Sequence, residues 1–348
     1  MGKQAKVVKQ SNTPDIESDT PQGQKIIGRV ETVNAGKLFG FSSKFLDFDI
    51  PKFVWEDAKG NPVKHPHVPD LDPVYEFNIE YLTPILWALR DNKKAWLSGH
   101  TGTGKSSLVK QVCALLNWPM LRVNFDSEIT RLDLIGRDVL KREGNTTVSE
   151  FVDGVLPTAL SGPYVLLCDE VDFIRPDVAY VFQRALEDEG LLITEDGGRM
   201  VHPHPWCRII ATANTKGQGD DDGIYQGARE QSLAFLDRFT CWVTFNYLTK
   251  REEGNILAQL VPDLNKDRKK EVLQYVEEHR RAFLDGRVLQ PLSPRGIRAL
   301  AESVVLFDGF EAGSSFRRAI NCTILDKANK NDRQILEGLI DRIITKSN

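Results

Sequence analysis

The sequence predicts an α/β protein in which a parallel sheet carries helices on both faces, followed by a smaller α-helical domain. Three observations lead to this prediction. Short apolar segments alternate with helical segments between residues 75 and 245. A glycine-rich turn joins the first of these apolar segments to the helix after it. From residue 249 onward the pattern is helical throughout.

Composition and charge describe an ordinary globular chain. Of its 348 residues, 41% are hydrophobic and 27% are charged, which excludes wholesale disorder and a collagen-like repeat. The formal net charge of −4 gives no overall signal for binding to nucleic acid or to an anionic membrane. We therefore do not expect nucleic acid as the partner.

The cysteines and the N-terminus point to a cell compartment. No two of the five cysteines form a C-x-x-C pair, so free thiols in a reducing compartment are the plainest interpretation. No apolar run approaches the roughly 18 residues that a membrane-spanning helix needs, and the polar N-terminus lacks the apolar stretch of a secretory signal. We expect a cytoplasmic protein with no membrane span.

Changes in composition divide the chain into four parts. Residues 1–25 are polar and predict a disordered tail, whereas residues 26–70 carry the short apolar patches of a small module or strap. Residues 71–248 show the alternating strands and helices of an α/β core. Residues 249–348 show helical periodicity and predict an α-helical lid domain.

Within these parts the expected elements follow in order. Apolar segments predict strands over residues 95–98, 120–125, 165–168, 208–213 and 242–245. A helix over 106–117 follows the first strand, and a polar stretch near 137–152 predicts an inserted β-hairpin. In the last part, helices are expected over 251–260, 266–284, 294–307 and from 316 to the end.

The strongest local motif joins the first strand to its helix. It reads Gly99-His-Thr-Gly-Thr-Gly104-Lys105-Ser106, a full G-x-x-x-x-G-K-[ST] pattern. Glycines let the backbone curl so that N–H groups point at phosphate oxygens, Lys105 adds positive charge, and the Ser106 hydroxyl can bind Mg²⁺. An ordinary glycine-rich turn is the alternative, but the strand before and the helix after favour phosphate binding. We expect ATP to contact Gly99, His100, Thr101, Gly102, Thr103, Gly104, Lys105, Ser106 and Ser107.

Polar side chains end two of the later strands. Asp169 and Glu170 follow the third strand, and Asn214 follows the fourth. A carboxylate at a strand tip beside a phosphate site can hold Mg²⁺, which suits Asp169, while Glu170 is placed to orient or deprotonate the attacking water. Asn214 can hold that water opposite the γ-phosphate. An asparagine that only makes a turn is the alternative.

Two arginines complete the candidate site. Arg238 lies just before the last strand, and Arg295 lies at the helix start that Pro294 marks. A guanidinium beside a transferred phosphoryl group accelerates the reaction by about 10³ to 10⁵. Arg238 is far along the chain from the glycine-rich loop, and in this fold type we expect it to point outward and reach the nucleotide of a neighbouring subunit, which requires a ring. A surface salt bridge is the alternative for either arginine.

The ordered set of motifs resembles the AAA+ ATPases. More narrowly, it is similar to the MoxR branch and, within that branch, to the ATPase subunit of the aerobic cobalt chelatase (the CobS type). The resemblance runs from residue 68 to residue 248. It includes stretches outside the general nucleotide machinery, such as Leu116-Asn-Trp-Pro119 and Arg175-Pro-Asp-Val178.

This resemblance implies a P-loop NTPase fold, a hexameric ring with ATP and Mg²⁺ at the subunit interfaces, and a helical lid. It also implies a partner with a von Willebrand factor A-type domain. In the chelatase, ATP hydrolysis helps to drive Co²⁺ into a corrin-precursor macrocycle. The alternative is a chaperone-like remodeller of such a partner, host or viral, with no tetrapyrrole chemistry.

By the same resemblance, Ser106 and Asp169 hold Mg²⁺, and the catalytic roles fall to Glu170, Asn214, Arg238 and Arg295. Arg229 lies in a loop that departs from the family pattern. It is either a second interface arginine or a surface residue.

Two His-Pro-His runs, at residues 65–67 and 202–204, invite a metal-site interpretation. No cysteine or paired carboxylate lies at ligand spacing from them, so we expect histidines that serve turns or packing.

Overall fold

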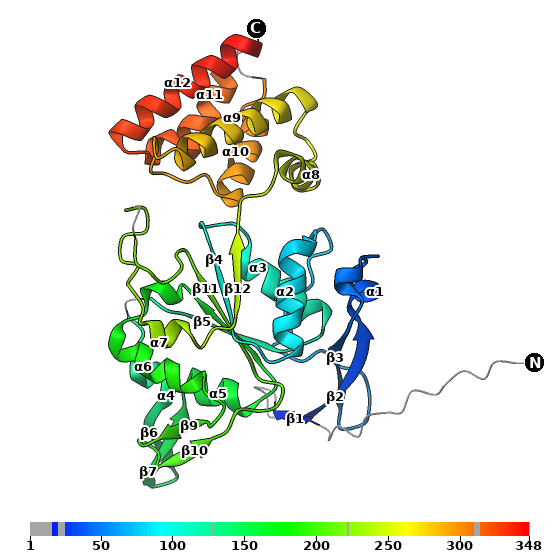
Figure 1. The fold of residues 1–348 in the computed structure, drawn as a ribbon, viewed down its shortest axis with the longest axis vertical. Helices are drawn as coiled ribbons and strands as arrows, with labels where there is room; N and C mark the ends of the chain where they lie inside the picture. Colours follow the sequence, from blue (N-terminus) through cyan, green and yellow to red (C-terminus); the bar gives the residue numbers. More distant parts are fainter. Residues whose placement is uncertain (1–15, 20–24, 127, 221–222, 310–313, 348) are drawn as a thin grey trace, which may run out of the picture.

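The computed structural model describes residues 16–19, 25–126, 128–220, 223–309 and 314–347. The helical domain lies beyond one end of the central sheet, and two small hairpins lie at the opposite end (Figure 1). A separate small sheet flanks the core.

The central sheet has five parallel strands in the order β12-β4-β11-β8-β5. Their bounds are β4 (Ala95–Gly99), β5 (Met120–Asn124), β8 (Val165–Asp169), β11 (Arg208–Ala213) and β12 (Cys241–Phe245). β8 and β11 are buried along their whole length, because a parallel sheet in this class is covered on both faces. The predicted parallel sheet is thus confirmed.

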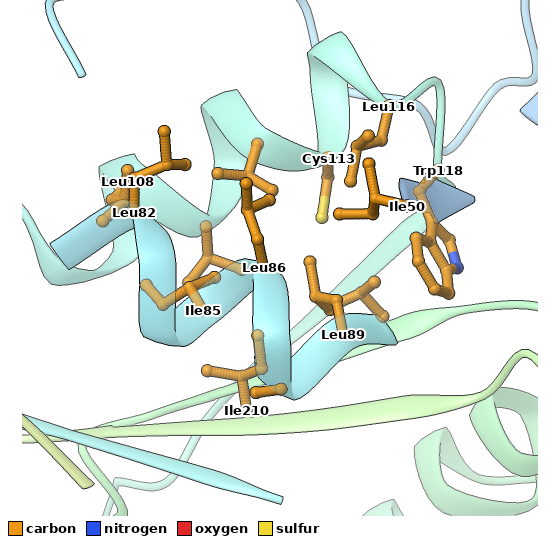
Figure 2. Close-up of a cluster of buried hydrophobic side chains, with 14 of the residues drawn as sticks. Ile50, Leu82, Ile85, Leu86, Leu89, Leu108, Cys113, Leu116, Trp118 and Ile210 are labelled. Atoms are coloured by element: carbon orange, nitrogen blue, oxygen red, sulfur yellow. The ribbon is translucent and has the colours of Figure 1, made fainter. Parts of the chain in front are cut away.

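Helices cover the two faces of this sheet. Ile209 belongs to one apolar core and Ile210 to the other, since successive strand residues point to opposite faces. The core around Ile210 is closed by α2 (Ile79–Arg90) and α3 (Lys105–Leu115), whose leucines meet above the sheet in Figure 2. The core around Ile209 is closed by α4 (Arg131–Ile135), α5 (Val155–Ser161) and α6 (Pro176–Ala185).

The N-terminal part packs against the α2–α3 side. It consists of β1 (Ile16–Asp19), β2 (Lys25–Asn34), α1 (Ala35–Phe39), a 3-10 turn η1 (Lys44–Leu46) and β3 (Asp49–Asp57). Trp55 of β3 is fully buried, and its indole N–H donates to the Asn117 carbonyl at 2.9 Å. The module is therefore joined to the core by aromatic packing.

Part of the predicted tail is ordered. Within residues 1–25, the stretch 16–19 instead forms β1, which pairs antiparallel with β2. The sequence offers only one apolar side chain there, Ile16, and that side chain is buried in the core. Lys25, the last residue of the predicted tail, begins β2, and residues 1–15 and 20–24 lie outside the described part of the chain.

Two antiparallel hairpins lie at the end of the core away from the helical domain (Figure 1). The first, β6 (Gly136–Glu143) with β7 (Thr146–Asp153), occupies the residues of the expected insertion. The second, β9 (Leu191–Ile193) with β10 (Arg199–Val201), has strands too short to be recognised from their periodicity. Arg199 of β10 forms an ion pair with Asp153 of β7, which ties the two hairpins together, and a second ion pair with Asp196 in the turn of its own hairpin.

The helical domain contains α8 (Lys250–Leu260), α9 (Lys266–Leu284), α10 (Pro294–Leu306), α11 (Ser314–Thr323) and α12 (Lys330–Ser347). The helical signal from residue 316 to the end was expected to be one segment, but it is divided by the 3-10 turn η3 (Leu325–Lys327). The division occurs because the Asn329 side chain accepts from the Asp332 N–H at 2.8 Å and caps a new helix.

The histidines of the first His-Pro-His run serve packing. His65 is fully buried, lies 4.6 Å from the Trp55 ring, and contacts the rings of His67 and Tyr164. In the second run, His204 Nδ1 accepts from the Trp206 N–H at 3.1 Å. Among the described residues, no cluster of three or more His, Cys, Asp or Glu side chains is arranged to hold a metal ion.

Candidate active site

The glycine-rich loop lies at the carboxyl end of β4 and leads into α3. Gly102 (φ 81°) and Gly104 (φ 92°) adopt left-handed conformations, which only glycine reaches without strain. The Thr103 hydroxyl donates to the His100 carbonyl at 2.8 Å and braces the loop. The first N–H groups of α3 and its positive dipole end therefore face the space that the loop encloses.

Lys105 lies at the centre of this arrangement. Its side chain is 8% exposed, and Nζ donates to the carbonyls of Gly99 at 2.5 Å and His100 at 3.1 Å. It also donates to Asn214 Oδ1 at 3.4 Å, so the structure brings these two predicted site residues together. Burial lowers the pKa of Lys105 to about 8, and the negative charge of Asp172 is the first of three that oppose this effect. The loop thus holds a cation that it can present to phosphate.

Asp169 is a buried carboxylate of the site and accepts hydrogen bonds from three side chains. Its Oδ1 accepts from the Ser106 hydroxyl and from the Thr212 hydroxyl, each at 2.6 Å, and its Oδ2 accepts from Arg122 Nε. The carboxylate is 2% exposed. Ser106 and Asp169 therefore present neighbouring oxygen donors, the ligand type that Mg²⁺ prefers. Neither Thr212 nor Arg122 was predicted, although a lone arginine in the apolar segment 120–125 was a usable signal.

Glu170 has an unusual backbone. At φ 59° and ψ 39° it is left-handed, although it carries a side chain, and it begins the 3-10 turn η2 (Val171–Phe173). A left-handed backbone is energetically unfavourable for a residue other than glycine, and residues in this conformation are concentrated at functional sites. The conformation turns the chain sharply at the tip of β8 and leaves the Glu170 side chain exposed. This suits a carboxylate that must meet water and a ligand.

An aromatic cluster connects the loop to the helical domain. His100 Nδ1 lies 2.9 Å from the Tyr225 hydroxyl, which also accepts from the Thr101 N–H at 3.2 Å. The His100 ring stacks on Tyr247 with centroids 5.7 Å apart and meets Phe283 of α9 edge-on at 5.0 Å. His100 was expected only as a loop residue. Its role in joining the two domains depends on residues more than a hundred positions away and has no local signal.

The predicted arginines occupy different environments. Arg295 is exposed in the first turn of α10, whose start lies against the loop, since a Cβ on Gly102 would meet Ser293 Cβ at 2.6 Å. Arg238 follows the short helix α7 (Leu233–Leu236) and forms an ion pair with Glu187 at 2.5 Å. Arg229 is exposed. Of these side chains, only Arg295 is placed by its own element beside the glycine-rich loop.

Among the described residues, no helix combines the length and the apolar character that crossing a membrane requires.

Comparisons with known proteins show what the chain is similar to. Residues 95–239 match the family model described as AAA domain (dynein-related subfamily). The chain is 36% identical to the aerobic cobaltochelatase subunit CobS of Sinorhizobium sp over 309 residues, which cover 88% of each chain. It is 24% identical to an uncharacterized protein of Staphylococcus epidermidis over 242 residues, covering 68% of this chain and 84% of that one. A solved structure of a RuvB mutant from Thermotoga maritima covers 76% of this chain and 69% of its own at 15% identity, with a TM-score of 0.43 that is too low to bear on function.

Proposed function

The chain belongs to the AAA+ ATPase family, in the group that includes the aerobic cobaltochelatase subunit CobS, and from this premise we propose that it is a ring-forming ATPase that drives metal chelation. The proposal has three levels: hydrolysis of ATP, assembly into a ring, and use of the released energy by a partner. Each level is supported by different residues and is tested separately.

ATP binding follows from the glycine-rich loop. The loop N–H groups and the α3 dipole attract the triphosphate, and the buried Lys105 ammonium exchanges its backbone carbonyl partners for phosphate oxygens. Ser106 and Asp169 are the residues that would hold Mg²⁺, which when bound neutralises charge on the β- and γ-phosphate oxygens. Asp169 already accepts from two hydroxyls, so its orientation is fixed before ligand binds.

Hydrolysis needs a water oriented for in-line attack on the γ-phosphorus. In the proposed step Glu170 takes a proton from this water, a new P–O bond forms, and the bond to the β–γ bridging oxygen breaks to leave ADP. Asn214 is 3.4 Å from Lys105 Nζ and 3.3 Å from the Thr101 hydroxyl, which puts its amide at the mouth of the loop. Arg295 and a neighbour's Arg238 would stabilise the developing charge.

One observation carries the hydrolytic proposal. The Ser106 hydroxyl and the Asp169 carboxylate are 2.6 Å apart although they lie 63 positions apart in the sequence. A strand tip and a loop that meet in this way place an acid beside the phosphate site. The test is phosphate release with Mg²⁺ and ATP: Lys105→Ala should abolish nucleotide binding, and normal ATP affinity in that variant would contradict the assignment.

The biological role is proposed from the similarity to the cobaltochelatase subunit CobS. We infer that the ring assists insertion of a divalent metal, with Co²⁺ as the first candidate, into a macrocycle held by a separate subunit. The expected partner carries a von Willebrand factor A-type domain. Negative-stain imaging with ATP tests the ring. A pull-down with that partner, followed by Co²⁺ insertion monitored through macrocycle absorption, tests chelation.

Remodelling of a protein partner without tetrapyrrole chemistry is the second candidate. It is favoured by the two hairpins, which expose apolar side chains away from the nucleotide site: Leu140 is 74% exposed, Leu192 46% and Met200 47%. Apolar groups on an exposed hairpin suit contact with protein. Complex formation and ATPase stimulation by the partner, with no metal insertion, would favour this candidate over chelation.

A further inference from the structure

Asp172 lies in the middle of the η2 turn, close to the nucleotide residues in the sequence. Its side chain is 0% exposed, two positions after Glu170 and three after Asp169. Burying a carboxylate is costly unless hydrogen bonds compensate it. The hydrogen bonds of Asp172 therefore explain how a carboxylate can be buried in this turn.

One oxygen of Asp172 makes all of its side-chain hydrogen bonds to the segment that follows β11. Oδ2 accepts from the Asn214 N–H at 2.9 Å, from the Thr215 N–H at 3.0 Å and from the Thr215 hydroxyl at 3.2 Å. These donors belong to the strand tip that carries the Asn214 amide. The carboxylate thus acts as a clamp on the main chain of that tip.

The other carboxylate oxygen, Oδ1, does not bond this segment. Within the part of the chain that the structure describes, Asp172 Oδ1 is buried and makes no hydrogen bond. Burial raises the pKa of this carboxyl, while the N–H groups of Asn214 and Thr215 oppose the rise. A buried acceptor without a donor lowers the stability of the folded state. The hydrogen bonds of Oδ2 must therefore compensate for the cost of burying Asp172.

The main chain of Asp172 makes a second connection. Its carbonyl accepts from the Arg229 N–H at 2.7 Å, which fastens the loop that leads on to α7. Within the same turn, the Phe173 N–H donates to the Glu170 carbonyl at 2.9 Å. Asp172 therefore lies in the turn that shapes Glu170 and at the same time holds the strand tip of Asn214.

We propose that Asp172 is a positioning residue for the hydrolytic water, which it serves by fixing the Asn214 strand tip relative to Glu170. The inference rests on the proposed ATP hydrolysis and assigns Asp172 no contact with the nucleotide. Two groups that must hold one water come from different strands, β8 and β11. Asp172 belongs to the turn after β8 and its side chain bonds the tip of β11, so it holds the two segments at a fixed distance. Displacement of such groups by about 1 Å can cost about 10²-fold in rate.

A competing explanation uses the charge of Asp172 rather than its shape. Asp172 helps to keep Lys105 protonated, and this effect would require the negative charge. The two explanations differ for conservative variants. Asp172→Asn keeps an oxygen able to accept the three bonds but loses the charge, whereas Asp172→Glu keeps the charge but displaces the oxygen by one methylene.

The helical domain offers a matched control. Asp332 is 3% exposed, and its Oδ2 also accepts from two consecutive main-chain N–H groups, those of Leu289 and Gln290, each at 3.0 Å. Asp332→Ala therefore removes the same kind of clamp away from the strand tips. It should lower the melting temperature as Asp172→Ala does, and change kcat by less than about twofold.

The experiment measures kcat, KM and ATP affinity for the wild type, Asp172→Asn, Asp172→Glu, Asp172→Ala and Asp332→Ala, with thermal melts to confirm folding. We expect Asp172→Glu and Asp172→Ala to lose about 10²-fold in kcat with ATP affinity changed by less than about threefold, and Asp172→Asn to stay within about threefold of wild type. If Asp172→Ala does not fold, the comparison of Asn with Glu decides.

Three outcomes overturn the proposal. They are full activity in Asp172→Glu, a loss in Asp172→Asn as large as that in Asp172→Glu, and an equal loss of kcat in Asp332→Ala. An inactive wild type would instead overturn the proposed function, so the two failures are distinguishable.

Discussion

The Arg238 guanidinium is paired within its own chain, with its NH2 group 2.5 Å from Glu187 Oε1. Glu187 lies just beyond α6, and the hydrogen bond from Arg238 is the main cause that lowers its pKa. The guanidinium also donates to the Ala234 carbonyl of α7. To act on a neighbour's nucleotide, Arg238 must break its ion pair with Glu187. Partly exposed ion pairs are weak enough to break in this way.

Removal of this arginine gives the first prediction. Arg238→Ala should lower kcat by about 10³-fold with ATP binding largely intact, because the charge that it supplies matters in the transition state. Mixing Arg238→Ala with Glu170→Gln subunits should restore part of the phosphate release, since each variant supplies what the other lacks. Mixtures no more active than either variant alone would show that the arginine acts within its own subunit.

Release of the arginine extends this prediction. Glu187→Gln should leave kcat unchanged or raise it, because the guanidinium no longer has to break a charged pair. Asp188→Asn is the control, since it removes the adjacent ion pair with Lys94, 2.7 Å long, and should leave kcat unchanged. A loss in Glu187→Gln comparable to that in Arg238→Ala would mean that the pair itself is required.

The backbone of Glu170 gives the second prediction. Glu170→Gly should raise the free energy of unfolding by about 1 kcal/mol, because glycine adopts the left-handed conformation without a Cβ penalty, and it should abolish turnover. Urea unfolding and phosphate release measure the two effects. Asn92→Gly, at a left-handed position that is also exposed, is the control and should leave kcat unchanged. An active Glu170→Gly variant would remove Glu170 from the proposed mechanism.

The third prediction concerns Arg122, which donates to the carboxylate expected to hold Mg²⁺. A bound cation must share or displace this guanidinium, so Arg122→Gln should lower the Mg²⁺ concentration for half-maximal binding by about three- to tenfold. Calorimetric titration of Mg²⁺ into the ADP complex measures it without turnover. Arg131→Gln breaks a similar ion pair, with Glu195, and should not change the titration. An unchanged or higher Mg²⁺ requirement in Arg122→Gln would contradict the prediction.

The fourth prediction is a loss of stability in mild acid. Burial lowers the pKa of both His65 and His279 to about 4, below the ordinary value near 6.5. The unfolded chain then binds more protons than the folded chain between these two values, so stability is complete above about pH 6.5 and falls as the pH approaches about 4. At about pH 5.5 each histidine should lower the free energy of unfolding by about 1.4 kcal/mol relative to neutral pH.

Urea unfolding at about pH 7.5 and about pH 5.5 checks this prediction. His279→Gln should reduce the difference between the two pH values by about 1.4 kcal/mol. A difference that His279→Gln does not alter would show that this histidine takes up no proton on unfolding.

Short-range chemistry explains what could be predicted. The strands of the central sheet and the glycine-rich loop are each specified within about ten consecutive residues, so their patterns are legible without the fold. The pairing of Ser106 with Asp169 also follows, because the tips of parallel strands meet at one sheet edge. Residues 16–19 of the predicted tail were misjudged because a strand stabilised by pairing to β2 needs little apolar character of its own, and Lys25 was misjudged at the boundary because it begins β2.

The residues that were missed depend on the register between distant segments. Arg122 reaches Asp169 across 47 positions, and Thr212 reaches it across 43, because β5 and β11 flank β8 on either side. Asp172 meets Asn214 only through the same stacking of strand tips. The side-chain chemistry of each residue is visible in the sequence, but its partner is not.

The amino-acid order by itself determined that this protein has a phosphate-binding loop on a parallel sheet, because hydrophobic period and glycine spacing act locally. Only the tertiary structure decided that Arg238 pairs with Glu187 in its own chain and that His100 joins the loop to the helical domain. The physical reason is that these contacts link segments whose separation in space is set by sheet order and domain packing, and not by distance along the chain.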